Sequence, residues 1–187
     1  FTGTKGKSTS AYYLKSILDV WQAGQGRGET GVISSIDTYD GVERFESHLT
    51  TPEPLDLERH FANAVGAGIR YLTMEVSSQA LKYDRVKNVE FAAAVFLNIG
   101  MDHISPIEHP NFEDYFASKL RIFAQAAAAC VNLDCDHADR VLEAARKNCP
   151  RIITFSQKDP SATIFGSQVR KAGGDILFRV KTPRYSR

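Results

Sequence analysis

Residues 2–9 read Thr2-Gly3-Thr4-Lys5-Gly6-Lys7-Ser8-Thr9 and have the pattern of a phosphate-binding loop. In such a loop, glycine-rich backbone amides cradle phosphates, a lysine reaches the outer phosphates, and the hydroxyl after it binds magnesium. Lys7 and Ser8 occupy those two positions. The match to the GxxxxGK(S/T) pattern is imperfect, because Phe1 stands at the first glycine and a glycine comes at position 3 instead.

An amphipathic helix is expected directly after this loop. Apolar residues recur at helical spacing until the glycine-rich stretch 24–28, and they are Ala11, Leu14, Ile17, Leu18 and Trp21. A Gly-Lys-Ser triplet alone also arises by chance, but a helix after it is the context that nucleotide binding requires. The sequence therefore predicts a nucleotide-binding loop at the start of a helix.

Strands and helices alternate along the rest of the chain. We expect a hairpin of 31–36 and 42–47 around Asp40-Gly41, strands at 69–76, 91–97, 127–133, 152–155 and 175–180, and helices near 57–65, 112–124 and 138–147. Several of these strands are continuously apolar, which is typical of a sheet covered on both faces. We predict an α/β fold with a P-loop, a largely parallel sheet with helices on both faces, and a small antiparallel addition from Ala162 onward.

Composition favours small-molecule chemistry. The chain carries a formal net charge of +1 and no long basic block, so it offers no electrostatic surface for nucleic acid or for a membrane. Its apolar runs are shorter than a bilayer span and no signal peptide is found, so we expect a cytoplasmic protein. The three cysteines lack the paired spacing of a zinc site and are expected to be reduced thiols.

We expect residues 1–187 to form one domain taken from a longer protein. The first residue is Phe1 rather than Met, and a phosphate-binding loop follows at once, although such loops need a strand before them. The last expected strand runs into Lys181, Thr182 and Pro183 without a closing element.

Three polar residues are expected at the carboxyl ends of strands. Glu75 follows the strand that begins at 69, and Asp102 and His103 lie just beyond the strand 91–97. In open parallel sheets the ligand site forms outside these ends, where the phosphate-binding loop also lies. A Glu75 oxygen suits magnesium, whereas His103 is a less usual ligand for so hard a cation. The alternatives are an exposed carboxylate at a strand end and a histidine outside the site.

Lys119 is the least expected residue of its helix. Its three- and four-residue spacing places it on the apolar face of that helix, formed by Phe112, Tyr115, Phe116, Leu120 and Phe123. Burial favours the neutral amine, which is nucleophilic and adds carbon dioxide to give a carbamate, a carboxylate-like magnesium ligand. The alternative from the residues alone is a lysine that reaches water from the edge of the stripe.

Five motifs together resemble the central ATP-binding domain of the Mur ligase family. They lie at 3–8, 50–52, 74–81, 98–103 and 115–119, and their order and spacing cover most of residues 2–125. Thr50-Thr51-Pro52 and the Glu-Val-Ser-Ser-x-Ala-Leu motif, followed by Arg85, are most similar to the UDP-N-acetylmuramoyl-tripeptide synthetases of that family. After residue 125 the match is looser.

The resemblance implies the roles of individual residues. The ATP-binding residues would be Gly3, Thr4, Lys5, Gly6, Lys7, Ser8, Thr9 and Asn98. Ser8 and Glu75 would bind one Mg²⁺, and His103 and a carbamylated Lys119 would hold a second Mg²⁺, so the candidate catalytic residues are Lys7, His103 and Lys119. The contacts to the UDP-N-acetylmuramoyl peptide would be Thr50, Thr51, Ser77 and Arg85.

The implied reaction is ATP-dependent amide formation in peptidoglycan synthesis, through an acyl phosphate that an incoming amino acid displaces. In the family an N-terminal domain holds the UDP portion and a C-terminal domain supplies the amino acid. We therefore expect this chain alone to hold nucleotide weakly and not to ligate.

Two other interpretations stay open at this point. A sister ligase of the folylpolyglutamate or cyanophycin type shares the loop, but Thr50-Thr51-Pro52 and Ser77-Ser78 argue against it. A non-catalytic P-loop binding module would have no need for an amine at Lys119. Gln79 stands where the tripeptide synthetases usually carry His, and Met101 where a polar residue is common, so the nucleotide-sugar substrate is left open.

Overall fold

The structure is a computed structural model that describes residues 1–184. The chain forms two compact units, one containing residues 1–89 and 101–119 and the other containing residues 90–100 and those from Leu120 onward. The phosphate-binding loop, Glu75, His103 and Lys119 belong to the first unit. Within residues 1–184, no helix is both long enough and apolar enough to cross a membrane.

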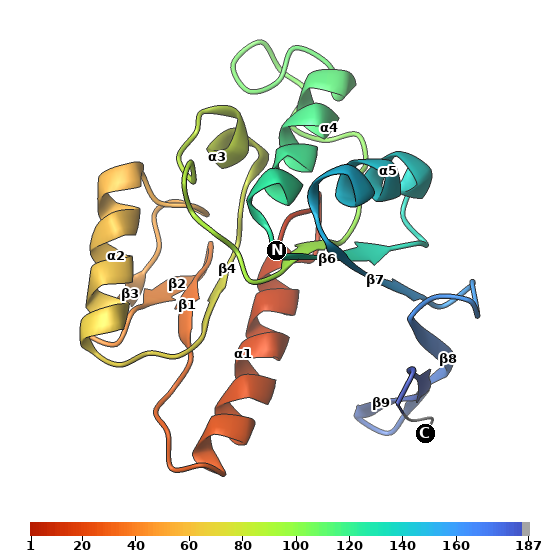
Figure 1. Ribbon diagram of the computed structural model, residues 1–187, viewed down its shortest axis with the longest axis horizontal. Coiled ribbons are helices and arrows are strands. Elements are labelled where there is room, and N and C mark those ends of the chain that lie inside the picture. The colour runs from red at the N-terminus through yellow and green to blue at the C-terminus, as the bar shows by residue number, and fades with distance from the viewer. Residues whose placement is uncertain (185–187) are drawn as a thin grey trace. The chain divides into compact units, whose positions relative to one another are not determined.

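The first unit is built on a four-stranded sheet with the order β3-β2-β1-β4. Its elements are α1 (Lys7–Ala23), β1 (Gly31–Ile33), β2 (Asp37–Tyr39), β3 (Arg44–Glu46), α2 (Pro54–Gly66), β4 (Leu72–Met74), α3 (Ser78–Lys82) and α4 (Phe112–Leu120), the last of which ends one residue beyond the unit. Strands β1 and β4 run parallel, whereas β2 is antiparallel to both β1 and β3. Figure 1 shows α2 beside the β2–β3 hairpin.

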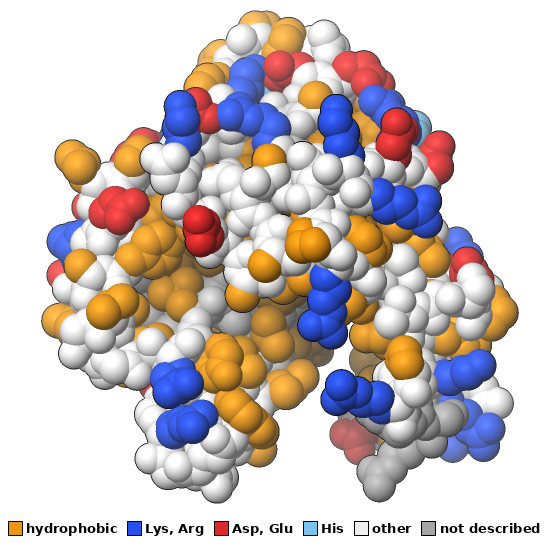
Figure 2. Space-filling model, in the orientation of Figure 1, with side chains coloured by type: hydrophobic (Ala, Val, Ile, Leu, Met, Phe, Trp, Pro, Cys, Tyr) orange, Lys and Arg blue, Asp and Glu red, His pale blue; other side chains and the backbone are white. Residues whose placement is uncertain are grey.

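The second unit is built on a five-stranded sheet with the order β5-β6-β7-β8-β9. Its elements are β5 (Ala94–Phe96), the 3-10 helix η1 (Arg121–Gln125), β6 (Ala128–Asn132), α5 (Ala138–Asn148), β7 (Arg151–Ser156), β8 (Ile164–Ala172) and β9 (Asp175–Lys181). Strands β5 to β8 are parallel and β9 is antiparallel to β8. Figure 2 shows Lys and Arg side chains over the β8–β9 hairpin.

The predicted α/β fold is confirmed. Strands alternate with helices, parallel pairing joins β1 to β4 and β5 through to β8, and an antiparallel strand follows near the end. The parallel strands fall into two sheets, one in each unit, rather than into the single sheet expected. The expected antiparallel addition is reduced to β9, because β8 still pairs parallel with β7.

The segment 31–47 forms three strands where two were expected. The Ser34 hydroxyl accepts hydrogen bonds from the amides of Ile36 and Asp37, at 3.0 and 3.1 Å, and donates to the carbonyl of Asp37. This local bonding by a serine side chain competes with strand pairing and reverses the chain. The first strand therefore ends at Ile33, and 37–39 returns along it as β2.

The Asp40-Gly41 turn between β2 and β3 is confirmed. Asp40 Oδ1 accepts from the amides of Val42 and Glu43, at 3.0 and 2.7 Å, which closes the turn. Gly41 has a φ of 89°, and a Cβ there would lie 2.5 Å from the Cβ of Ala67. A residue with a side chain would therefore meet both backbone strain and a steric clash.

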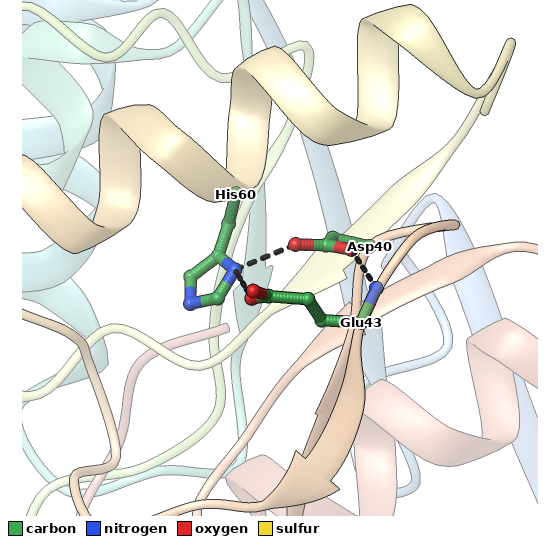
Figure 3. Close-up of side chains that lie close together, drawn as sticks. All are labelled: Asp40, Glu43 and His60. Carbon is green, nitrogen blue, oxygen red and sulfur yellow. Dashed lines mark hydrogen bonds and ion pairs between the residues drawn. The ribbon is translucent and has the colours of Figure 1, made fainter.

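A buried hydrogen-bonded pair, Asp40 and His60, ties this turn to α2 (Figure 3). Asp40 Oδ2 accepts from His60 Nδ1 at 2.7 Å and from Asn63 at 2.9 Å, and both Asp40 and His60 are buried. Glu43 lies close enough to complete a group of three possible metal ligands, but its carboxylate pairs with Arg59. Because both Asp40 oxygens already have protein donors, we interpret the group as a structural tie.

Helix α1 turns a different face inward than its apolar spacing predicts. Its buried residues are Ala11, Lys15 and Gln22. Ile17 and Trp21, which belong to the expected stripe, are exposed instead. Lys15 can be buried because its amine lies 2.7 Å from Asp19 and 2.6 Å from Glu29. The interpretation of the apolar stripe as the buried face is therefore wrong for most of this helix.

Asp40→Asn tests the tie between the hairpin and α2. Burial raises the pKa of Asp40, but hydrogen bonds from Glu43, His60 and Asn63 outweigh it and lower the pKa from 3.8 to about 2. The carboxylate therefore contributes stability that is present above pH 3.8 and is lost as pH falls towards 2, about 2 kcal/mol in all. Asparagine brings a donor where donors already point, so we expect a loss of about 2 kcal/mol or more at pH 7.

Urea unfolding of this chain at pH 7 and between pH 4 and 2 measures both effects. The exposed Glu58→Gln on the same helix is the control and should match wild type. An Asp40→Asn chain as stable as wild type at pH 7 would contradict the account.

Candidate nucleotide site

The phosphate-binding loop lies beside the end of β4. The Val76 amide donates to the Phe1 carbonyl at 2.8 Å, and the amine of Phe1 donates to the Met74 carbonyl at 2.7 Å. Gly6, the N-cap of α1, has a φ of 84°, which glycine adopts without a steric penalty. Since Gly6 has no side chain that could cap the first turn, the amide dipoles at this helix start suit an anion.

Two lysines converge on one carbonyl of this loop. Lys7 Nζ donates to the Gly3 carbonyl at 3.1 Å and to the Thr4 carbonyl at 3.4 Å. Lys119 Nζ donates to the same Gly3 carbonyl at 3.0 Å, although 116 residues separate the two. The structure thus brings the candidate catalytic lysines together at the loop.

Lys119 is buried, with 2% of its surface exposed. Burial, reinforced by the nearby Lys7 and opposed by Asp102, lowers the pKa of Lys119 from 10.5 to about 7. Burial also lowers the pKa of Lys7, where Glu75 and Asp102 oppose the shift. The Lys119 amine stands 4.7 Å from the centre of the Tyr115 ring, which favours the cation when it forms. The alternative of a lysine that reaches water is therefore wrong for this structure. With a pKa of about 7, a large share of Lys119 is the neutral, nucleophilic amine near pH 7.

Ser8 and Glu75, the expected ligands of one Mg²⁺, are joined through Ser35. The hydroxyls of Ser8 and Ser35 lie 3.1 Å apart, and a Glu75 carboxylate oxygen accepts from the Ser35 amide at 2.8 Å and from its hydroxyl at 3.2 Å. Glu75 is 1% exposed, so it is not the exposed strand-end carboxylate of the alternative interpretation. The hydroxyl and carboxylate oxygens present here are of the type that Mg²⁺ prefers.

His103 lies next to the same tyrosine as Lys119. Its ring centre is 5.8 Å from that of Tyr115, and its Nδ1 is 3.2 Å from a Glu108 carboxylate oxygen. His103 has a φ of 56°, and its amide donates to Asp102 at 2.9 Å. His103 and Lys119 thus lie next to the same aromatic ring, His103 exposed and Lys119 buried, and their expected role in holding a second cation stays a prediction.

Thr51 and Ser77, two of the expected substrate contacts, bond to each other. The Thr51 hydroxyl donates to the Glu75 carbonyl at 3.1 Å and accepts from the Ser77 amide at 3.0 Å. The Ser77 hydroxyl accepts from the Ala80 amide at 3.0 Å as the N-cap of α3. Thr51 is buried, so within the described structure its hydroxyl orders the loop after β4.

Arg85 is oriented by the segment that carries the threonines. It donates to the Thr51 carbonyl at 3.4 Å and pairs with Glu53 at 2.9 Å. Thr50 is half-buried beside this segment. Asn98 follows β5 and belongs to the other compact unit, so its expected contact with ATP stays a prediction.

Sequence reasoning missed three residues of this region: Tyr115, Ser35 and His109. Tyr115 was assigned only to an apolar stripe, yet its hydroxyl lies 3.1 Å from the Thr4 hydroxyl. Ser35 sits in a loop without a motif, and His109 was not singled out although it is fully buried. Only tertiary contacts distinguish these residues from ordinary tyrosine, serine and histidine.

Comparison with known proteins agrees with the resemblance to the Mur ligase family. Residues 1–186 match the family model of the Mur ligase middle domain. The UDP-N-acetylmuramoyl-L-alanyl-D-glutamate--L-lysine ligase of Enterococcus faecalis is 45% identical over 162 residues, which cover 86% of this chain and 31% of that relative. A UDP-N-acetylmuramyl-tripeptide synthetase of Bifidobacterium longum is 43% identical over 159 residues, covering 84% and 30%.

A solved structure shares the fold. It is a UDP-N-acetylmuramoyl-L-alanyl-D-glutamate--2,6-diaminopimelate ligase, with a TM-score of 0.81 and 22% identity over 98% of this chain and 37% of that one. This chain therefore spans about a third of the length of the proteins that it matches.

Lys119→Met tests the burial of the amine. Because the pKa of Lys119 is about 7 in the folded chain and near 10.5 when unfolded, the unfolded chain binds this proton more tightly. Native stability therefore falls as pH drops from 10.5 to 7 and then levels off. We expect Lys119→Met to stabilise the chain by roughly 2 to 4 kcal/mol at pH 7, with the difference shrinking as pH rises to 9.5.

Urea unfolding in carbonate-free buffer, followed by the fluorescence of Trp21, measures this difference. Lys87→Met, at an exposed lysine, should leave stability unchanged. A Lys119→Met chain that is less stable at every pH would contradict a destabilising buried amine.

Proposed function

The chain belongs to the Mur ligase middle domain family, and from this we propose that it is the nucleotide-binding part of an ATP-dependent ligase. The proposed ligase adds an amino acid to a UDP-N-acetylmuramoyl dipeptide. Its reaction transfers the γ-phosphate of ATP to a peptide carboxylate, releases ADP, and then forms an amide as the incoming amine displaces phosphate. The names of the relatives at 43–45% identity support the tripeptide synthetase branch.

The observation that carries the proposal is the position of Lys119. Its amine is buried and bonded to the same Gly3 carbonyl as the loop lysine Lys7. A module that only binds nucleotide has no need to bury a second amine there, since burial of an amine is costly. A ligase that holds a metal ion beside the reacting phosphate does need this amine, because carbamylation turns it into a carboxylate-like metal ligand.

The described residues fit ATP and Mg²⁺ at this loop. The start of α1 presents backbone dipoles to the phosphates, and Lys7 would leave the Gly3 and Thr4 carbonyls to bind the γ-phosphate. Ser8 and Glu75 would hold one Mg²⁺, and His103 with carbamylated Lys119 a second one. When bound, Mg²⁺ supplies positive charge to the phosphoryl oxygens. Ser35 keeps the Glu75 carboxylate turned towards Ser8.

The muramoyl peptide is assigned to the edge formed by Thr50, Thr51, Ser77 and Arg85. Ser77 and Thr51 are already ordered by their mutual hydrogen bond. Arg85 would exchange its contact with Glu53 for an anionic group of the substrate, a charge-assisted bond of the stronger kind. Glu75 and Ser77 both follow β4 directly, so the carboxylate to be activated would lie next to Glu75 and the loop.

Ligation by the full-length protein tests the proposal. We expect sustained ADP release only when ATP, UDP-N-acetylmuramoyl-L-alanyl-D-glutamate and an amino acid are all present. Lys7→Met should lower kcat by about 100-fold or more, because it removes a positive charge from the developing phosphoryl negative charge. The matched control is Lys147→Met on α5, an exposed lysine of the other unit, which should keep wild-type rates.

Two other outcomes would favour the alternative functions, a sister ligase or a non-catalytic binding module. ADP release that requires a folate or another carboxylate in place of the muramoyl dipeptide would assign the chain to a sister ligase. Nucleotide binding without ADP release, in full-length protein that is folded, would favour a binding module and overturn the proposal.

A further inference from the structure

His109 is a buried histidine to which the proposed reaction gives no role. It is 0% exposed and uses both ring nitrogens. Its Nδ1 lies 2.6 Å from Asp114 Oδ2 on α4, and its Nε2 lies 2.9 Å from the Ser78 hydroxyl at the start of α3. The chain therefore has an Asp114–His109–Ser78 relay, which connects two helices through the loop 101–111.

The proton positions in this relay follow from chemistry. Lys82 and His109 donate to Asp114 and hold the pKa of its carboxyl below the ordinary value, so Asp114 is ionised. An ionised carboxylate only accepts, so Nδ1 of His109 carries a hydrogen. Nε2 accepts from the Ser78 hydroxyl in a neutral imidazole and donates to it in an imidazolium, so the bond to Ser78 is present in both forms. Both ring nitrogens of His109 and the Asp114 oxygen that faces them have partners, which makes the geometry of the relay specific.

Each end of the relay lies next to residues of the proposed site. Ser78 follows Ser77, whose amide is bonded to the Thr51 hydroxyl. Asp114 precedes Tyr115, whose ring meets the His109 ring at 5.1 Å and whose hydroxyl reaches Thr4. One turn further along α4 is the buried amine that donates to the Gly3 carbonyl. The relay thus links the peptide edge to the phosphate side.

We propose that His109 is a positioning residue, which fixes the start of α3 against α4 so that the peptide carboxylate lies in line with the γ-phosphate. This inference rests on the function proposed above. The relay leaves Lys7 and Ser8 untouched, so its loss should displace the peptide and spare ATP. Displacements of about 1 Å at a reacting group lower rates by up to about 100-fold.

Two variants of the full-length enzyme cut the relay at different atoms. Asparagine in His109→Asn keeps an N–H near Nδ1 for Asp114 but is too short to reach Ser78. Ser78→Ala removes only the hydroxyl and leaves the loop intact. Each should lower kcat/KM for the UDP-muramoyl dipeptide by about 10- to 100-fold, with the KM for ATP within about twofold of wild type.

The double variant shows whether the two residues act as one unit. If they do, His109→Asn with Ser78→Ala should be no worse than the more damaging single change, because the link is already broken. The proposal would be overturned if the two single effects multiplied in the double variant, if the KM for ATP rose as much as the KM for the dipeptide, or if the variants had wild-type kinetics. A loss of folded enzyme alone would lower kcat and leave both KM values unchanged, so a rise in the KM for the dipeptide is the part of the result that a stability defect does not produce. His137→Asn, at a left-handed position of the other unit that asparagine tolerates, is the control.

Amide hydrogen exchange separates this inference from the proposed function. If wild-type protein does not ligate, the proposed function fails, and exchange at Ser77 and Ala80 still decides the role of His109. Faster exchange at both amides in His109→Asn and Ser78→Ala would support the link, whereas unchanged exchange would overturn it. Should His109→Asn fail to fold, Ser78→Ala carries the test by itself.

Discussion

Two amines share the carbonyl oxygen of Gly3, and the organisation of the site depends on this arrangement. Lys7 and Lys119 donate to that oxygen at 3.1 and 3.0 Å from opposite ends of the first unit's sequence. Two protonated amines so close in a buried place repel each other, and burial makes each charge costly. The lowered pKa of Lys119 relieves part of this cost. An anionic phosphate at Lys7 and a carbamate on Lys119 would relieve the rest.

Much of the first unit serves to keep those amines in place. The Phe1 backbone joins the loop to the end of β4, and Glu75 follows that strand, facing the loop through Ser35. Tyr115 joins α4 to the loop through its hydroxyl, which lies 3.1 Å from that of Thr4. A charged substrate and its metals would then meet groups that are already ordered, which lowers the reorganisation that catalysis requires.

The features predicted correctly were those that have a local pattern. The helix that begins in the loop 2–9, the Asp40-Gly41 turn and the position of Lys119 on the buried face of its helix follow from motif, turn chemistry and helical spacing. The features missed depend on side-chain hydrogen bonds and ion pairs that no motif or spacing shows. Ser34 reverses the chain with its own hydroxyl, and His109 is defined only by residues on α3 and α4. Apolar spacing also predicted the wrong buried face of α1, because spacing does not show the ion pairs with which Lys15 is buried.

The central claim is that the buried amine of Lys119 becomes a carbamate beside the reacting phosphate. Carbon-13 NMR of the full-length protein, incubated with labelled bicarbonate, Mg²⁺ and ATP, measures this directly. The account predicts a carbamate signal that is present in wild type, absent in Lys119→Ala and retained in Lys87→Met. A folded wild-type protein that binds ATP and shows no carbamate signal would contradict it.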